Sequence, residues 1–402
     1  MHVPKQVLVA LLLVSSCTCE RGERPTQIGA PDTTAPRGSE TEGRSEGVGP
    51  SPTEAPSKSL PRGEPVRLAT RQDCGIWADN SVWCWSRRCA PDEMCTPVQL
   101  DFPAPPPGVQ VRDVIRSGLH DCVLLDDGEV RFPERNHGQA TLCRPDVLGQ
   151  YRIADFVYSP SETCVLTREG EVSCWSLPAL RTWEQNPDVV LSIEPRRVID
   201  EVTRIDGLDT FCVVRRDRSV WCWGHNGYGQ LGDGTFQDRH FPRKVEKLPP
   251  AANVAIGSAH VCAVTTDGAV YCGGNNTSGQ LGIGRAPSAG HYPHEENVNP
   301  HDRPRPVRVQ DLPGVSQLIV TGYYSCALGE DRSIYCWGGG PEHATPERLG
   351  GPPAAQLVRS SSAACLLTSD GQTYCWGGAG SGLRAASEVP KRVHWTGMPP
   401  SR

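Results

Sequence analysis

The chain has 402 residues, of which 42 are Gly, 37 are Pro and 18 are Cys, and only 37% are hydrophobic. Turn-forming residues at such short intervals argue against a helical or doubly wound enzyme, so we expect an all-β fold. The net charge of −6 argues against nucleic-acid binding, because the overall balance supplies no basic stripe for phosphates.

The amino terminus has the pattern of an export signal. A Lys at position 5 precedes the apolar run VLVALLLV at 7–14, which is too short to span a bilayer. The tetrad VSSC at 14–17 resembles the bacterial lipobox, in which the Cys thiol is joined to diacylglycerol and the Cys becomes the first residue after cleavage. We therefore predict a signal peptide over residues 1–16, a lipid on Cys17, and a location on the bacterial cell envelope, periplasmic or at the cell surface, with the outer membrane favoured. A plain signal peptide cut near Cys19 is the alternative.

The next segment has the composition of a disordered tether. Residues 20–65 contain no aromatic side chain and are rich in Pro, Gly, Ser, Thr, Glu and Arg. Such a segment cannot bury enough apolar surface to fold. We predict a tether over residues 17–65.

From residue 66 to residue 396 the chain is a repeat, followed by a tail over 397–402. The clearest copy, VCAVTTDGAVYC at 261–272, predicts a strand, an Asp-Gly turn and a second strand. A copy at 121–132 keeps its first Cys and has Phe132 in place of the second. The seven copies start at positions 74, 122, 164, 212, 262, 326 and 365, and intervals of this size predict a seven-bladed β-propeller. In six copies two cysteines lie ten positions apart: Cys74-Cys84, Cys164-Cys174, Cys212-Cys222, Cys262-Cys272, Cys326-Cys336 and Cys365-Cys375.

The interval of ten places the two cysteines of each copy opposite each other. With a three-residue loop whose last residue is left-handed, Thr265 pairs with Ala269 and Cys262 faces Cys272. Six identical wide pairs favour disulfides over zinc, whose ligands come in closely spaced pairs. Arg218 and Arg332 stand where the left-handed residue belongs. These two turns therefore need another loop or carry strain.

Seven extended segments, each opened by Pro, recur between or after the hairpins. They begin at Pro97, Pro145, Pro195, Pro242, Pro306, Pro346 and Pro390. The first hairpin has no such segment before it and the last segment has no hairpin after it. We therefore expect the segment from Pro390 to Trp395 to complete the blade begun at Val66, so that a shared blade closes the ring.

A Trp follows the second Cys in five copies, and we expect it to pack between blades. The five are Trp85, Trp175, Trp223, Trp337 and Trp376. His120 and His260 occupy the same place in their copies, and we expect them to be interior structural residues.

Two glycine-rich stretches carry a family resemblance. WGHNGYGQLGDG at 223–234 and GGNNTSGQLGIG at 273–284 resemble the signature of the regulator of chromosome condensation repeat. GSAHVCAV at 257–264 and SGLHDCVL at 117–124 are similar to its Gly-x-x-His strand. The resemblance implies a seven-bladed propeller that presents a binding face, without naming a partner.

The resemblance and the absence of enzyme motifs predict a non-enzymatic protein-interaction module on the envelope. No phosphate-binding loop, His-Glu-x-x-His pair or Gly-x-Ser-x-Gly elbow occurs in the sequence. We expect no cofactor, no nucleic acid and a monomer that binds an envelope or extracellular protein. The alternatives are an inhibitor of a secreted hydrolase, resembling a β-lactamase inhibitory propeller of the family, and a glycan- or peptide-acting hydrolase. Nucleotide exchange, the activity of the family's founder, does not fit an exported chain.

The longest spacing contains an insertion over residues 285–304 that is rich in His and acidic residues. We expect a plain solvated loop there first, with a partner-binding loop and then a metal site as alternatives. Its candidate residues are His291, His294, Glu295, Glu296, His301 and Asp302. Among the remaining cysteines we expect the pairs Cys89-Cys95 and Cys122-Cys143, which leaves Cys19 without an assigned partner.

Overall fold

The computed structural model describes residues 65–70, 74–84, 98–117, 120–132, 148–159, 162–176, 195–284, 301–359, 364–376 and 390–393. The chain divides into a unit over residues 1–57 and a unit over residues 58–402, and every described residue lies in the second. The predicted signal peptide, lipidated Cys17 and tether therefore lie outside the described residues, apart from Pro65. Among the described residues, no helix is long and apolar enough to cross a membrane.

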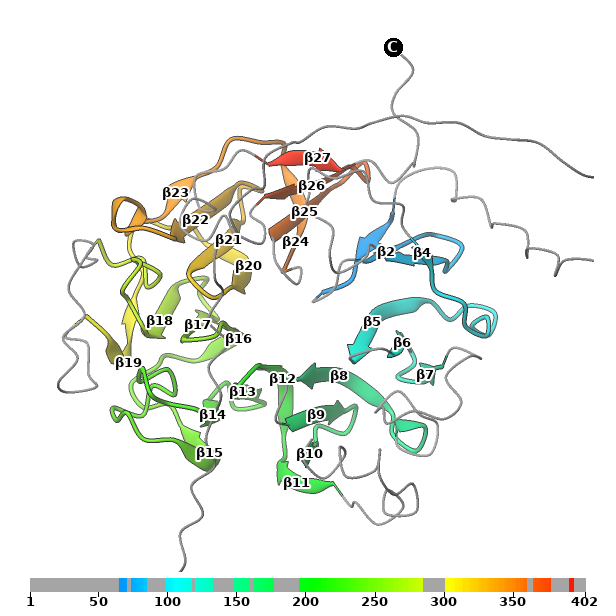
Figure 1. Ribbon diagram of the computed structural model, residues 1–402, viewed down its shortest axis with the longest axis horizontal. Helices are drawn as coiled ribbons and strands as arrows, with labels where there is room; N and C mark the ends of the chain where they lie inside the picture. The colour runs from blue at the N-terminus through cyan, green and yellow to red at the C-terminus, as the bar shows by residue number, and fades with distance from the viewer. Residues whose placement is uncertain are drawn as a thin grey trace, which may run out of the picture. The chain divides into compact units, whose positions relative to one another are not determined.

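Seven antiparallel sheets follow one another along the chain and surround a common centre, which makes the second unit a seven-bladed propeller (Figure 1). The first blade holds β1 (Arg67–Leu68), β2 (Cys74–Ile76), β3 (Val82–Cys84) and β4 (Val98–Gln99), and the second holds β5 (Val111–Ser117), β6 (His120–Leu125) and β7 (Val130–Arg131). The third holds β8 (Ile153–Tyr158), β9 (Glu162–Thr167), β10 (Val172–Ser176) and β11 (Arg196–Ile199). The fourth holds β12 (Val202–Gly207), β13 (Thr210–Arg215), β14 (Val220–Gly224) and β15 (Arg239–Lys244).

The other three blades repeat this order. The fifth holds β16 (Ala251–Ile256), β17 (His260–Thr265), β18 (Val270–Gly274) and β19 (Arg303–Arg308). The sixth holds β20 (Val315–Val320), β21 (Tyr324–Gly329), β22 (Ile334–Gly338) and β23 (Glu347–Arg348), with the short helix η3 (Pro341–His343) before its last strand. The seventh holds β24 (Ala354–Arg359), β25 (Ala364–Thr368), β26 (Thr373–Trp376) and β27 (Lys391–Val393). The all-β, seven-bladed prediction is confirmed.

The two middle strands of each blade form the predicted hairpin. Thr265 donates to the Ala269 carbonyl at 2.8 Å, and Cys262 lies opposite Cys272. All six cysteine pairs at the interval of ten form disulfides, with Cα atoms 4.0 to 4.1 Å apart. Arg218 and Arg332 have φ angles of 67° and 64°, so they use the same turn and adopt the left-handed conformation that costs a side chain energy.

The prediction of a blade shared between the two termini is wrong. The segment after Pro390 forms β27, which pairs with β26 of the last blade, and the first blade begins with its own strand β1. Each Pro-opened segment that the structure describes as a strand is therefore the outer strand of the blade whose hairpin precedes it. The inner strand comes directly before the hairpin, as β12 does in the fourth blade.

Apolar side chains fill the spaces between neighbouring blades. Trp337 of the sixth blade packs in one cluster with Cys262 and Leu281 of the fifth. The described Trp residues that follow a second Cys are all buried, with 0 to 3% of their surface exposed: Trp175, Trp223, Trp337 and Trp376. Each packs against the preceding blade, which confirms their predicted role.

The first and last blades meet through hydrogen bonds and an apolar cluster. The Gln356 side chain of β24 accepts from the Leu68 amide and donates to the Leu68 carbonyl of β1, both at 3.0 Å. Trp77 and Trp83 of the first blade pack with Val358 of the last. Side-chain hydrogen bonds and packing close the ring.

We predict that Gln356→Leu destabilises the propeller more than Gln317→Leu. Gln317 makes one such contact, accepting from the Leu357 amide at 2.8 Å, whereas Gln356 makes two. We expect Gln356→Leu to lower the free energy of unfolding by about 2 kcal/mol and Gln317→Leu by about 1 kcal/mol. Urea unfolding with disulfides intact measures both. Equal losses would show that ring closure does not depend on the paired amide contact.

Candidate interaction face

The propeller has two unlike ends, which we call the loop face and the hairpin face. Because the four strands of a blade alternate in direction, the turn after the inner strand and the link to the outer strand emerge at one end, the loop face. The hairpin turns emerge at the other end, the hairpin face. Hydrogen bonds from His225 to the Asp209 carbonyl and from Gly339 to the Tyr323 carbonyl hold the link against the turn in two blades.

In the fourth blade the link to the outer strand folds around a buried Asn. The side-chain oxygen of Asn226 accepts from the Leu231 amide at 2.9 Å. The side-chain NH₂ group of Asn226 donates to the carbonyls of Thr235 and Gln237, both at 3.0 Å. Asp238 accepts from the Asn226 backbone amide at 2.7 Å. These hydrogen bonds hold the Gly-Gln-Leu-Gly turn at 229–232 rigidly, and the turn supports the exposed residue Tyr228 that precedes it.

The fifth blade repeats this arrangement and adds an insertion. Asn276 accepts from the Leu281 amide at 3.1 Å, and Asp302 accepts from the Asn276 amide at 3.2 Å. The Asn and the Asp are 12 positions apart in the fourth blade and 26 apart in the fifth, so the insertion lies between these two anchors. Burial raises the pKa of the Asp302 carboxyl to about 6. Asp302 is thus a structural group that fixes the end of the insertion.

Exposed aromatic side chains lie on the loop face. Tyr228, in the link between β14 and β15, has 41% of its surface exposed, and Tyr323, in the turn between β20 and β21, has 57%. The ring centroids of His225 and Tyr228 are 6.3 Å apart. Tyr combines apolar area with a hydrogen-bonding hydroxyl, which suits protein contacts.

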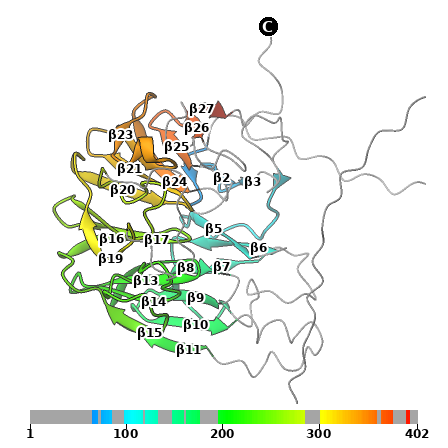
Figure 2. The same cartoon turned by 60° about the vertical axis from the view of Figure 1, so that its left-hand side comes forward.

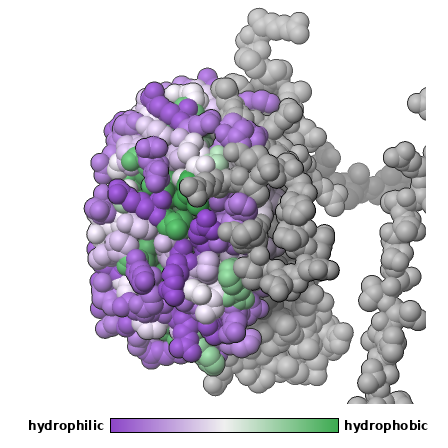
Figure 3. All heavy atoms as spheres, turned by 90° about the vertical axis from the view of Figure 1, so that its left-hand side faces the viewer, coloured by the Kyte–Doolittle hydropathy of each residue, from purple (hydrophilic) through white to green (hydrophobic). Residues whose placement is uncertain are grey.

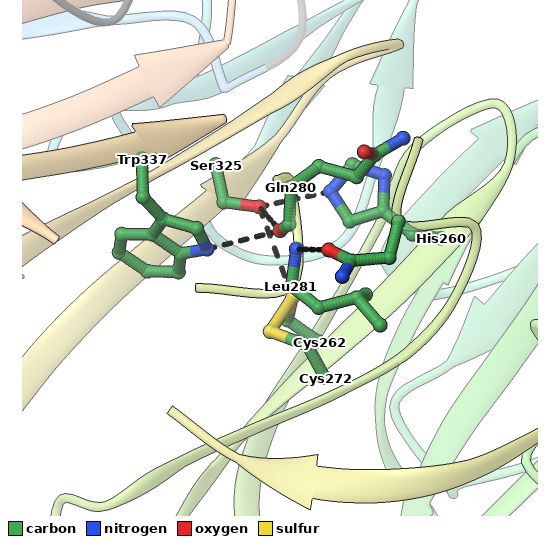
Figure 4. Close-up of a disulfide and its surroundings, with 8 residues drawn as sticks. His260, Cys262, Cys272, Gln280, Leu281, Ser325 and Trp337 are labelled. Carbon is green, nitrogen blue, oxygen red and sulfur yellow. Dashed lines mark hydrogen bonds between the residues drawn. A yellow bond between two sulfur atoms is a disulfide. The ribbon is translucent and has the colours of Figure 1, made fainter. Parts of the chain in front are cut away.

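Beneath this face, a hydrogen-bond network joins the fifth and sixth blades (Figure 4). His260 is fully buried and its Nε2 lies 2.8 Å from the Ser325 hydroxyl. Ser325 Oγ and Trp337 Nε1 both donate to the Gln280 carbonyl, at 3.2 and 2.9 Å. Because the Ser325 proton goes to Gln280, the network assigns the His260 proton to Nε2.

The other ring nitrogen, Nδ1, has no hydrogen-bond partner among the described residues. Protonation there would bury an unpaired charge, and desolvation accordingly lowers the pKa of His260 to about 3. The prediction of an interior histidine is confirmed at His260. The side chain of His120 lies outside the described residues.

The Gly-x-x-His pattern has a steric cause at its first residue. A Cβ atom on Gly257 would lie 1.9 Å from the Thr321 carbonyl oxygen of the sixth blade, which is far inside van der Waals contact. Only Gly permits the two turns to approach this closely. The pattern therefore reports blade packing.

A polar cavity of about 410 Å³ occupies the centre of the ring and is lined by the inner strands. Three carboxylates line it, and each accepts hydrogen bonds from backbone amides. Asp206 accepts from Gly207 and Ile256 at 3.0 and 2.8 Å, Asp113 from Thr70 and Val114 at 3.0 and 2.8 Å, and Asp155 from Phe156 at 2.8 Å. These groups brace the inner strands.

Several predicted residues lie outside the described residues: His291, His294, Glu295, Glu296, Cys89, Cys95 and Cys143. Cys122 is disulfide-bonded, and its partner must also lie outside them, because every other described cysteine is paired within a hairpin. His301 and Asp302, near the end of the insertion over residues 285–304, are the described members of this set. In the described part of the chain, three residues with potential metal ligands lie close together: Glu162, Cys164 and Cys174. The two sulfurs of this group are joined in a disulfide.

Comparison with known proteins identifies the repeat. The model of the regulator of chromosome condensation (RCC1) repeat matches residues 217–264 and 267–328, and a second model of this repeat matches 251–280. The E3 ubiquitin-protein ligase HERC2 of Mus musculus and of Homo sapiens is 28% identical over 248 residues, 57% of this chain. The match spans 5% of the length of these relatives.

Solved structures support the fold. Yeast RCC1 (Prp20), bound to Kap60, has a TM-score of 0.54 at 17% identity, covering 78% of this chain and 79% of that one. Human WBSCR16 has a TM-score of 0.56 at 18% identity, covering 84% of this chain and 92% of that one. At identities this low, the similarity to these structures supports the fold and nothing about function.

We predict that His260 makes stability fall with acid. Its folded pKa of about 3 lies below the ordinary value of 6.5, so the unfolded chain takes up a proton that the folded chain cannot. Its full contribution is present above pH 6.5 and is lost as pH falls toward 3, at about 1.4 kcal/mol per pH unit.

Urea unfolding from pH 7 to pH 4 tests this in three proteins. His260→Gln should remove that slope relative to the wild type. The matched control, Ser325→Ala, removes the hydrogen-bond partner and should keep it, although both variants lose about 1 to 3 kcal/mol at pH 7. An unchanged slope in His260→Gln would contradict the assignment.

Proposed function

The chain belongs to the regulator of chromosome condensation (RCC1) repeat family, and from this premise we propose that it is a non-enzymatic module that binds a protein through its loop face. The observation that carries the proposal is the contrast within that face. Buried Asn226 and Asn276 hold rigid turns, and exposed Tyr228 and Tyr323 project from the same end. Rigid support for exposed aromatic side chains lowers the entropy cost of binding.

The central cavity supports a binding role over a hydrolase. A hydrolase of glycans needs a carboxylic acid and a second carboxylate directed at the substrate. Asp113, Asp155 and Asp206 instead accept hydrogen bonds from backbone amides of the inner strands. Inhibition of a secreted hydrolase is the second candidate, since it uses the same face and needs no catalytic group.

We propose further that the module is displayed on the bacterial cell envelope. The sequence VSSC at 14–17 carries this proposal, with a lipid on Cys17 and a tether over residues 17–65. Six buried disulfides fit an oxidising compartment, as an exported chain requires. The insertion at 285–304, anchored by Asp302 on the loop face, would add contacts to the same partner.

Photo-crosslinking in intact cells tests the binding face. We expect p-benzoylphenylalanine in place of Tyr228 or Tyr323 to form an adduct with the same protein. The matched controls are Lys247 and Asp311, exposed residues at the hairpin face, which should form none. Loss of the adduct on deletion of residues 285–300 would extend the face to the insertion. Adducts at Lys247 and Asp311 but at neither Tyr would contradict the proposed face.

If the adduct is a hydrolase, the inhibitor candidate makes a further demand. The purified chain should then block that enzyme at equimolar concentration, and Tyr228→Ala should weaken the block. Full activity of the enzyme at equimolar chain would exclude inhibition and keep the binding role.

Metabolic labelling with an alkyne fatty acid tests the anchor. We expect Cys17→Ala to abolish the label and to release the chain from membranes washed with high salt, because the thiol is the acceptor of the lipid. Cys19→Ala is the matched control and should keep both. A membrane-bound, unlabelled wild-type chain would contradict lipidation.

A further inference from the structure

The outer strands of three consecutive blades form a strongly cationic surface, which we call the rim arc. Half of the residues in β11, β15 and β19 are Arg or Lys, and none is Asp or Glu. The cations are Arg196, Arg197, Arg239, Arg243, Lys244, Arg303, Arg305 and Arg308. The whole chain has a net charge of −6, so this surface is opposite in sign to the molecule that carries it.

The rim arc is open to solvent and includes an exposed aromatic ring. Arg243, Lys244, Arg305 and Arg308 are exposed, and Phe241 has 69% of its surface exposed, the highest value among the described large hydrophobic side chains. The Arg196 guanidinium carbon lies 5.7 Å from the Phe241 ring centroid and so joins β11 to β15. Figure 3 looks onto the side of the ring where β19 lies, and hydrophilic residues dominate the described surface there.

Carboxylates compensate only part of this charge. Arg196, Arg197 and Arg239 form ion pairs with Glu162, Glu171 and Asp233, at 3.1, 2.7 and 2.9 Å. Hydrogen bonds from Ser219 and Thr265 are the main reason that the pKa values of the Asp217 and Asp267 carboxyls lie below the usual range. Lys244 and Arg308 lower these pKa values further. In contrast, Arg243 and Arg305 form no ion pair with any described residue. The β15 and β19 part of the rim arc therefore carries excess positive charge.

Protection of an edge strand does not explain why all charged residues in β11, β15 and β19 are positive. An outer strand needs charge or Pro to prevent pairing with another chain, and Pro242, Pro304 and Pro306 already serve this purpose. Charge of either sign can protect an edge, and the outer strand of the sixth blade includes Glu347. A set of cations with no anion among them therefore needs another cause.

We propose that the rim arc binds an acidic phospholipid surface. Basic residues attract anionic headgroups, and an exposed aromatic ring enters the boundary between headgroups and acyl chains. Lipids can move laterally to match fixed cations on the outer edge of a ring (Figure 2). A nucleic-acid or glycan strand would instead favour a groove. The proposal is independent of a partner at the loop face and of a lipid on Cys17.

Co-sedimentation with vesicles tests the proposal in the full mature chain carrying Cys17→Ala, which removes the lipid acceptor. We expect the chain to bind vesicles of about one part phosphatidylglycerol to two parts phosphatidylcholine at low salt, and to bind neither pure phosphatidylcholine nor any vesicle at high salt. Each basic residue near an anionic surface contributes about fivefold in partitioning, so Arg243→Gln with Arg305→Gln should lower binding about 25-fold. Phe241→Ala should lower it further.

The matched control changes the net charge equally at the hairpin face. Arg218→Gln with Arg332→Gln neutralises two exposed hairpin-turn residues and should leave vesicle binding unchanged. Equal loss in both double variants, or no binding to the anionic vesicles, would overturn the proposal. It would also be overturned if heparin bound the chain in place of vesicles and Phe241→Ala had no effect, because the arc would then recognise a soluble polyanion.

Discussion

The contact between the first and last blades is the constraint on which the ring depends. Every other contact between neighbouring blades joins two blades that are consecutive in sequence. The first and last blades, in contrast, are separated in sequence by the five blades between them. A β1 of only two residues offers little backbone for this contact, and Gln356 compensates by bonding to both polar groups of Leu68. If the contact between the first and last blades were lost, the apolar cluster that includes Trp77 and Val358 would be exposed to water.

The disulfides act as packing groups as well as crosslinks. The sulfurs of Cys262 and Cys272 lie in the apolar cluster between the fifth and sixth blades, in contact with the network of His260 and Ser325 (Figure 4). A disulfide at one fixed register holds six of the seven hairpins, so their strands can remain short and still pack on both faces.

The sequence predicted the hairpins more accurately than the inner strands, for a physical reason. The interval of ten residues determines the turn and the disulfide together, and Arg218 follows it at the cost of strain. The inner strands carry a β-bulge near their second residue, as between Val202 and Arg204, which interrupts the alternation of apolar residues. The prediction that the segment from Pro390 to Trp395 completes the first blade is wrong for this reason. The structural role of Asp302 could have been predicted from the sequence. The pair Asp238-Arg239 of the fourth blade repeats as Asp302-Arg303 in the fifth, and both Asp residues accept from the amide of the buried Asn.

The overall charge was a poor guide to the surface because turn chemistry determines where the acids lie. In the hairpin turns, Asp accepts the backbone amide two residues ahead, as Asp217 does from Ser219 at 2.9 Å and Asp331 from Ser333 at 3.0 Å. This requirement places acidic residues at the hairpin end of the blades whatever the protein binds. The outer strands have no such requirement, so cations can gather there without altering the turns. A negative net charge is therefore compatible with a basic rim arc, and composition alone does not exclude polyanion binding at an individual surface.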